Sequence, residues 1–177
     1  NFEFSNFAVL KSSHINAFVK YGHRTFSHAH PDKMTVEVTA FGRMVTRDLS
    51  NCGYGARLCN EWHRTSVSHN TVIADGKNHI STSEGETLYY GENPLTIKVR
   101  AKNVYPGIHF TRILEQTATT LEDEFLVQSE NVHTFDWVYH LDGKLLSDDL
   151  KLVSDDLGFN NDGYQHFMDV KRIEAEH

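Results

Sequence analysis

Apolar and polar residues alternate along several short stretches of this chain. From Met34 to Thr39 the even-numbered positions are apolar and the odd-numbered ones polar, as a strand with one buried face requires. Similar runs rich in Val, Ile, Thr, Phe and Tyr lie at 7–10, 17–20, 43–47, 96–99, 111–114, 124–127 and 137–139. These stretches are predicted to be β-strands.

Turn signals separate the predicted strands at short intervals, as at Asp75-Gly76, Pro106-Gly107 and Asp142-Gly143. No segment keeps a helical period over the dozen or so residues that a stable helix needs, and the most helix-compatible one, 147–157, is acidic. Short strands with hairpin-length connections favour an all-β, antiparallel β-sandwich over a parallel fold, which needs crossover helices. We expect a single domain over residues 1–177.

Composition and charge narrow the classes of function. The hydrophobic fraction of 39% predicts a folded globule, and no apolar run is long enough to cross a bilayer, so no membrane partner is expected. The net charge of −7 argues against general nucleic-acid binding, and any site for an anion must be local. Cys52 and Cys59 match neither a zinc pair nor a redox motif, which leaves open a disulfide or two free thiols.

Twelve histidines are present, and His28 and His30 form the sharpest local arrangement. In an extended backbone residues two apart point to one side, so both imidazoles would face one site. A catalytic zinc site takes three protein ligands and keeps one position open. Asp48 and His69 are the candidate further ligands; the alternative is that these histidines are ordinary surface or hydrogen-bonded core residues.

The predicted hairpin around Gly42 raises a geometric difficulty for this site. In a plain hairpin Asp48 would face Val36 or Glu37, which leaves His30 about 20 Å away at the usual strand rise. Only a reversal or a bulge of the chain near Pro31 would bring His30 to Asp48.

The segment from Ser27 to His79 carries a specific set of motifs. It contains HAHPD before the alternating strand, a Gly turn, an Asp closing the next strand, a GYG loop, WHR and HNTV followed by DG. This set resembles the C-terminal domain of the heparinase II/III-like polysaccharide lyases, a family that includes alginate and oligoalginate lyases. The family often has Trp-Tyr-Arg where this chain has Trp62-His63-Arg64, so the role of His63 stays open.

The resemblance implies a function and a set of site residues. It implies a zinc ion bound by His30, Asp48 and His69, and cleavage of an acidic, uronate-bearing glycan such as alginate, heparin or heparan sulfate. It also implies an N-terminal α/α-toroid domain of the same enzyme, which carries the catalytic tyrosine and the main carboxylate neutraliser. We therefore expect this chain alone to bind zinc but to turn over little, and we expect a periplasmic or secreted bacterial enzyme.

β-Elimination from a uronate needs a base at C5, an acid for the leaving oxygen and neutralisation of the carboxylate. His28 is the candidate catalytic group, with the alternative that it supports the metal site. Arg64, Trp62 and Tyr54 are candidate substrate-binding residues, since Arg pairs with carboxylate or sulfate and Trp stacks on sugars. Their alternatives are an internal ion pair, a core position and an ordinary turn residue.

Two other classes of function remain open. A cupin barrel has a similar first motif, imitated by Gly22, His28, His30, Glu37 and Gly42, and would bind iron or manganese through Glu37. The gap from His30 to Glu37 is too long for it, and its second motif is missing. A non-catalytic carbohydrate-binding or structural sandwich, with zinc only joining loops, is the third hypothesis.

Overall fold

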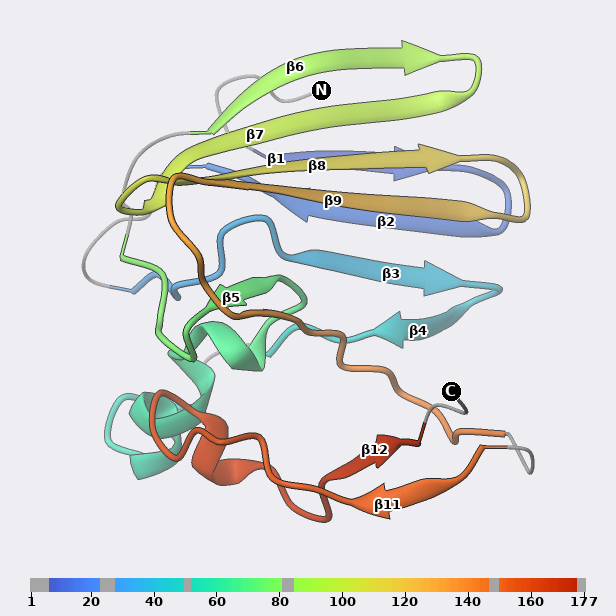
Figure 1. Ribbon diagram of the computed structural model, residues 1–177. Coiled ribbons are helices and arrows are strands. Elements are labelled where there is room, and N and C mark those ends of the chain that lie inside the picture. The colour runs from blue at the N-terminus through green and yellow to red at the C-terminus, as the bar shows by residue number, and fades with distance from the viewer. Residues whose placement is uncertain (1–6, 23–27, 50–51, 81–84, 147–149, 175–177) are drawn as a thin grey trace.

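The computed structural model describes residues 7–22, 28–49, 52–80, 85–146 and 150–174, and two four-stranded antiparallel sheets dominate it (Figure 1). The first sheet has the order β1 (Phe7–Lys11), β2 (Ile15–Lys20), β3 (Val36–Ala40) and β4 (Arg43–Thr46). The second has the order β6 (Gly85–Glu92), β7 (Leu95–Tyr105), β8 (Ile108–Gln116) and β9 (Leu121–Ser129). In both sheets neighbouring strands follow one another along the chain. Short connections join them except between β2 and β3, which residues 21–35 separate.

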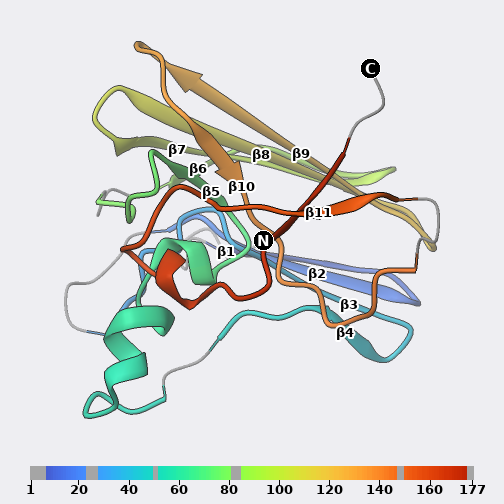
Figure 2. The same cartoon turned by 60° about the horizontal axis from the view of Figure 1, so that its bottom comes forward.

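The two sheets face each other and enclose one apolar core (Figure 2). Each strand sends alternate side chains inward, as Ala17 and Val19 do from β2 and Ile97 and Val99 from β7, all of them fully buried. This architecture confirms the predicted antiparallel β-sandwich.

Four strands were not predicted: β5 (Val72–Ala74), β6, β11 (Leu152–Ser154) and β12 (Lys171–Ile173). Strand β5 is buried on both faces and pairs with β10 (Phe135–Trp137), so it shows no alternation. Strand β6 is a mostly exposed edge strand, and β11 and β12 form a separate two-stranded antiparallel sheet that is largely exposed. Without a buried face there is little hydrophobic pattern to detect.

Among the described residues helical structure is limited to three short segments, in agreement with the lack of a helical period in the sequence. They are the π-helical turn η1 (Cys59–His63) and the 3-10 turns η2 (Ser66–Ser68) and η3 (Tyr164–His166). None of the described helices is long and apolar enough to span a bilayer. Cys52, which is exposed, and Cys59, which is buried, form no disulfide.

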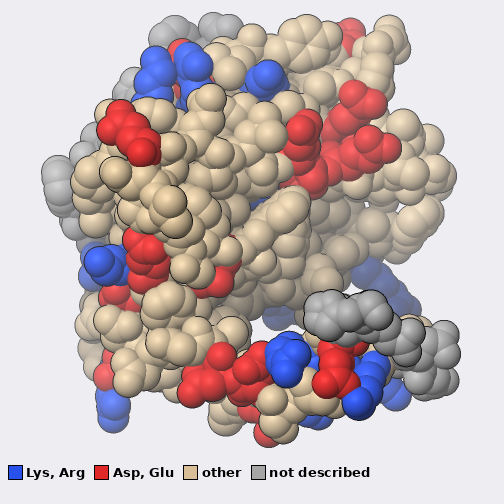
Figure 3. Space-filling view, viewed as in Figure 1, with Lys and Arg blue, Asp and Glu red and all other residues tan. Residues whose placement is uncertain are grey.

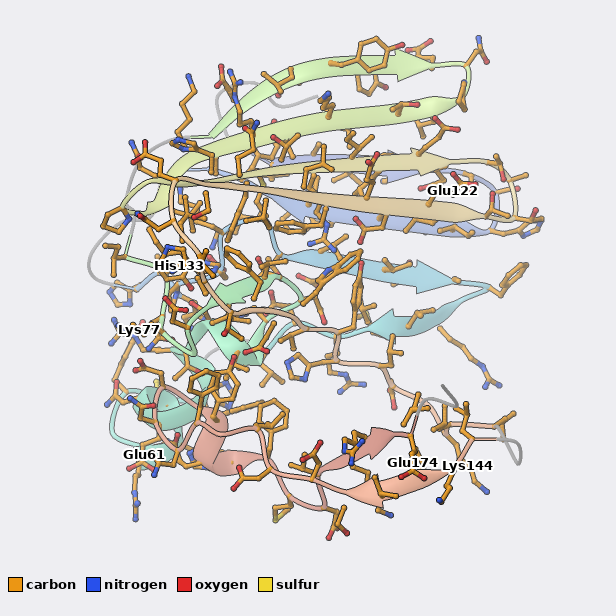
Figure 4. All side chains as sticks on the ribbon, in the orientation of Figure 1. Glu61, Lys77, Glu122, His133, Lys144 and Glu174 are labelled. Atoms are coloured by element: carbon orange, nitrogen blue, oxygen red, sulfur yellow. The ribbon has the colours of Figure 1, made fainter. Side chains whose placement is uncertain are left out.

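Charged side chains of both signs are interspersed over the face shown in Figure 3. Acidic groups gather near the β8–β9 hairpin, where Figure 4 places Glu122, while His133 lies at the opposite end of the sandwich. Nδ1 of His133 there donates a hydrogen bond to the Asp75 carboxylate at 2.7 Å, beside Lys77. Lys144 and Glu174 lie near the two-stranded sheet of β11 and β12, and Glu61 lies on η1 (Figure 4).

Arg112 on β8 is a fully buried charged side chain. Its Nε and Nη2 atoms donate to both carboxylate oxygens of Asp123, at 2.9 and 2.5 Å, and Nη2 also donates to the Tyr139 hydroxyl at 2.7 Å. Its Nη1 donates to the backbone carbonyls of Asn70, at 2.8 Å, and Met34. One guanidinium therefore joins β8 and β9 to the chain before β3, the chain before β5 and the chain after β10.

The Arg112 network generates a stability prediction. Arg112→Lys keeps the charge but cannot reproduce the planar fork of donors, so it leaves several buried acceptors unpaired. We expect the free energy of unfolding, measured by urea titration, to fall by about 3 kcal/mol or more.

Arg100→Lys is the matched control, because Arg100 lies on neighbouring β7 and pairs with exposed Glu86 at 2.7 Å. Its effect should stay within about 0.5 kcal/mol. Equal urea midpoints for Arg112→Lys and Arg100→Lys would contradict the role given to the buried guanidinium.

Candidate functional site

A reversal of the chain just before β3 solves the geometric difficulty posed by the sequence. The Thr35 N–H donates to the Asp32 carbonyl at 3.1 Å, and Met34 between them has a φ of 63°, a left-handed conformation that turns the backbone. Strand β3 consequently starts at Val36 and not at Met34, which corrects the predicted strand boundary. The turn folds residues 30–32 back toward the end of β4.

Asp48 follows β4 and lies opposite this turn. Its Oδ2 accepts a hydrogen bond from the Thr35 hydroxyl at 3.0 Å. Its Oδ1 lies 2.6 Å from Nδ1 of His69, and the His69 ring centroid lies 5.2 Å from that of His30. The side chains of Asp48 and His69 are therefore in contact, and the His30 ring lies beside that of His69. His30 is not one of the residues whose ligand atoms group closely enough to hold an ion.

Asp32 is a further member of this cluster and was missed as a candidate ligand. Single ligand atoms of Asp32, Asp48 and His69 lie within 4.8 Å of one another, an arrangement that could hold a metal ion. Lys20 on β2 reaches the same place and pairs with the Asp32 carboxylate at 2.6 Å. The signal was available, because Asp32 stands two residues after His30 in the motif HAHPD.

A small hollow opens onto the cluster, and we call it the metal hollow. It is lined by Phe18, Lys20, His30, Asp32, Thr35, Glu37, Asp48 and Leu49. Glu37, the ligand expected in a cupin, lies on the wall of this hollow, but it is not one of the three grouped residues. Burial, with a contribution from the charge of Asp48, raises the pKa of Glu37 above its ordinary value.

The protonation states in the cluster suit metal binding. Burial, helped by the nearby His69, lowers the pKa of His30 below its ordinary value, so its imidazole is neutral at neutral pH. Burial by itself raises the pKa of Asp48, but the hydrogen bond and charge of His69 and the bond from Thr35 outweigh it and hold that pKa low. Metal ions bind neutral imidazole and ionised carboxylate, which are the forms that these shifts favour for His30 and Asp48.

His69 supplies a test of whether the residues fit a metal ion. Its side chain is fully buried, and its Nε2 has no hydrogen-bond partner among the described residues. A buried imidazole nitrogen without a partner is costly, and a metal ion would satisfy it. The grouped residues Asp32, Asp48 and His69 supply two carboxylates and one imidazole, which are donors that zinc accepts, so they fit such an ion.

The backbone around the cluster is held by Asn70, the residue after His69. Its side-chain amide donates to the carbonyls of Val36, at 2.9 Å, and Arg47, at 3.3 Å, and its Oδ1 accepts from the His140 N–H at 2.7 Å. Asn70 thereby ties β3, the end of β4 and the segment after β10 to the ligand-bearing chain. Asn70 therefore occupies a position from which it can orient the neighbouring imidazole.

His28 lies outside the group of His30, Asp32, Asp48 and His69, which we call the metal cluster because of the ion that it could hold. It is exposed, its Nδ1 is hydrogen-bonded to the hydroxyl of Tyr54, and the two rings lie 5.0 Å apart in an edge-on arrangement. Residues 28–31 are not part of a strand, so the expectation that His28 and His30 face one site from an extended backbone has no support in their contacts. His28 and Tyr54 instead form an exposed pair of groups that can transfer protons.

Trp62 and Arg64 point into different hollows. Arg64 lines a polar hollow with Ala29, Pro31, Asn60, Asn78 and His79, which we call the arginine hollow. Trp62 packs edge-on against His140 and Phe167, at ring distances of 5.7 and 5.6 Å, and lines another hollow. Within the described part of the chain no carboxylate pairs with the Arg64 guanidinium, whereas Trp62 belongs partly to a small apolar cluster.

Comparison with solved structures identifies the fold. A heparinase III (the BT4657 gene product) superposes with a TM-score of 0.75 at 22% identity, over 88% of this chain and 27% of that protein. The heparan sulfate lyase HepC from Pedobacter heparinus gives 0.69 at 19% identity, over 86% of this chain and 24% of that protein. This chain therefore spans about a quarter of these larger proteins.

No curated protein sequence matches this chain. The family model for the heparinase II/III-like C-terminal domain matches residues 1–163. This match covers most of the chain and includes every residue of the metal cluster, and neither the cupin barrel nor an unrelated sandwich accounts for it. The chain belongs to the heparinase II/III-like family, as a C-terminal β-sandwich domain.

Proposed function

We propose that this chain is the zinc-binding β-sandwich domain of a polysaccharide lyase that cleaves uronate-bearing acidic glycans by β-elimination. The observation that carries the proposal is the grouping of Asp48 and His69 with Asp32, beside the His30 ring, in a chain of this lyase family. Heparan sulfate or heparin is the favoured glycan, because the similar structures are named heparinase III and heparan sulfate lyase. Alginate is a second uronate glycan to test.

The proposed zinc ligands are His30, Asp48 and His69, with Asp32 as a further carboxylate beside them. Zinc, when bound, would supply a fixed positive charge that holds the two carboxylates and the buried imidazole in one arrangement. Because residues 28–31 carry His28 at one end and His30 near the other, fixing His30 also fixes the stretch that presents His28.

The exposed pair of His28 and Tyr54 supplies the chemistry that β-elimination needs from this domain. Removal of the C5 proton requires a base, and departure of the C4 oxygen requires an acid. A histidine and a tyrosine in hydrogen-bond contact can share these tasks, with His28 next to the sugar and Tyr54 orienting it or passing on a proton. The carboxylate at C5 must also be neutralised, since its charge opposes formation of the carbanion.

Arg64 is the proposed anion-binding residue of this domain. Its guanidinium is half-buried in the arginine hollow, beside the side chains of Asn60 and Asn78. A guanidinium without a carboxylate partner is free to bind a uronate or sulfate with two parallel hydrogen bonds. Ala29 and Pro31 line the same hollow, so an anion bound there lies beside the stretch that carries His28 and His30.

The remaining catalytic groups would come from an N-terminal helical domain of the same enzyme. The similar solved proteins are about four times as long as the part matched by this chain, which leaves room for such a domain. Acidic polysaccharides are found outside the cytoplasm, so we propose a periplasmic or secreted enzyme. In such an enzyme residues 1–177 would form one sandwich domain that turns over little by itself.

The zinc ligands can be tested by elemental analysis and by competition with a chromogenic chelator. We expect about one zinc per chain, and a loss of affinity greater than about 100-fold for His30→Ala and Asp48→Asn, beyond the range seen for indirect supports. His14→Ala is the matched control, because His14 stacks on Phe41 at the β3–β4 hairpin and should leave affinity unchanged. If His30→Ala kept the wild-type affinity for zinc and Asp32→Asn lost it, the zinc ligand would be Asp32 and not His30.

The catalytic role of His28 predicts a different pattern. In the full-length enzyme His28→Ala should lower kcat by about 10²- to 10⁴-fold, the usual contribution of a general acid or base. Zinc content and melting temperature should stay unchanged, because the exposed side chain supports no buried group. The ultraviolet absorbance of the unsaturated product measures the rate on heparan sulfate, heparin and alginate. Loss of zinc and of stability instead would indicate a structural role.

The role of Arg64 in binding the anion can be separated from catalysis. Arg64→Gln removes the charge, so KM should rise by about tenfold or more while kcat changes less. Arg43→Gln is the control, since Arg43 is exposed on β4 away from the arginine hollow. An unchanged KM together with a lower melting temperature would make Arg64 a structural residue only.

A further inference from the structure

A second hollow lies on the other side of the segment that carries Asp48. It has a volume of about 440 Å³ and is lined by Arg47, Leu49, Trp62, His140, Leu141 and Asp142, and we call it the tryptophan hollow. Successive side chains of residues 47–49 divide between the two hollows: Arg47 lines only the tryptophan hollow, Asp48 only the metal hollow, and Leu49 both. The volume is within the range of about 300 to 1,000 Å³ that small-molecule sites occupy.

The walls of the tryptophan hollow are held by backbone bonds. The Arg47 N–H donates to the His140 carbonyl at 3.3 Å, and the Asp142 N–H donates to the Val45 carbonyl at 3.0 Å, so the two segments run as a short antiparallel ladder. His140 is fixed further by the bond from its N–H to Asn70 and by a contact of 2.8 Å between its Nε2 and the Val67 carbonyl. The hollow is therefore formed before any ligand arrives.

The polar groups of the hollow are balanced in charge. Arg47 pairs with Asp142 at 3.2 Å, and both side chains are more than half exposed, at 59% and 60%. Burial lowers the pKa of His140, so its imidazole adds no charge at neutral pH. The charges of the guanidinium and the carboxylate cancel, and the pair offers hydrogen-bond donors and an acceptor side by side. Such a pair is better suited to bind two adjacent hydroxyl groups than to bind an anion. Trp62 and the two leucines add an apolar surface for the C–H face of a sugar ring.

We infer that the tryptophan hollow is a subsite for an uncharged sugar ring, the neighbour of the uronate in an alternating glycan. Adjacent ring hydroxyls would bind Arg47 and Asp142, and the ring face would lie against Trp62. A role of this subsite in cleavage rests on the proposed lyase function. Binding of the sugar does not, since it needs no catalysis. It explains why Arg64 and Trp62 point into separate hollows: the first takes the charged sugar and the second the uncharged one.

Binding is tested by isothermal titration of the chain with two probes. One is the uncharged tetramer of N-acetylglucosamine, and the other is a tetrasaccharide that alternates N-acetylglucosamine and glucuronate, used in the His28→Ala background so that it is not cleaved. We expect Arg47→Ala and Asp142→Asn each to weaken binding of both probes by about tenfold. Arg64→Ala should weaken only the glucuronate probe, and the control Arg43→Ala should weaken neither. Melting temperatures near that of the parent chain establish that the variants are folded.

Three results would overturn the subsite. The first is binding of both probes that is unchanged by Arg47→Ala and Asp142→Asn, and the second is no binding of the uncharged probe. The third is tighter binding of the glucuronate probe in Asp142→Asn, since release of Arg47 from its partner would then create an anion site.

The product absorbance assay separates this inference from the proposed lyase function. Cleavage of a uronate glycan by the full-length enzyme, with KM unaffected by Arg47→Ala, would leave the lyase function standing and refute the subsite. If the protein bound the uncharged probe through Arg47 but cleaved no uronate glycan, the subsite would stand and the lyase function would be refuted.

Discussion

A single buried guanidinium, that of Arg112, holds the two halves of this domain together. A charge removed from water is tolerated only when its donors are matched by well-placed acceptors. Here the acceptors are the carboxylate of Asp123, the hydroxyl of Tyr139 and the carbonyls of Met34 and Asn70. These groups lie on four different segments, so displacement of any one segment would leave part of the charge unpaired. The sandwich and its loops are thereby obliged to keep one arrangement.

Two of the hydrogen bonds of Arg112 are made to backbone carbonyls next to the metal cluster. Met34 is the left-handed residue of the turn that brings Asp32 and His30 back toward Asp48, and Asn70 directly follows His69. Arg112 bonds to both carbonyls, so the positions of the candidate ligands are set from the opposite sheet. This arrangement places the site on rigid backbone at the edge of the first sheet, where precise ligand geometry is easier to keep than on a free loop.

Closely spaced residues serve different hollows along two segments of the site. In residues 47–49, Asp48 lines the metal hollow and Arg47 lines the tryptophan hollow. Residues 28–31 offer His30 to the metal hollow, His28 to Tyr54, and Ala29 and Pro31 to the arginine hollow. One metal ion bound at the junction would therefore restrain all three surfaces at once. An alternating glycan has the matching property of presenting different chemistry at successive rings.

The sequence alone determined the class of fold and the types of residue at the site. Strand alternation and turn residues depend on near neighbours, so the antiparallel sandwich could be predicted, and the motifs led to His30, Asp48 and His69. Only the tertiary structure decided what depends on contacts between distant segments. It set the reversal at Met34 that solves the distance problem, the entry of Asp32 and Lys20 into the cluster, and the burial of Arg112. It also separated Trp62 from Arg64, because two residues that are close in sequence can be directed into different hollows by whatever packs on each side.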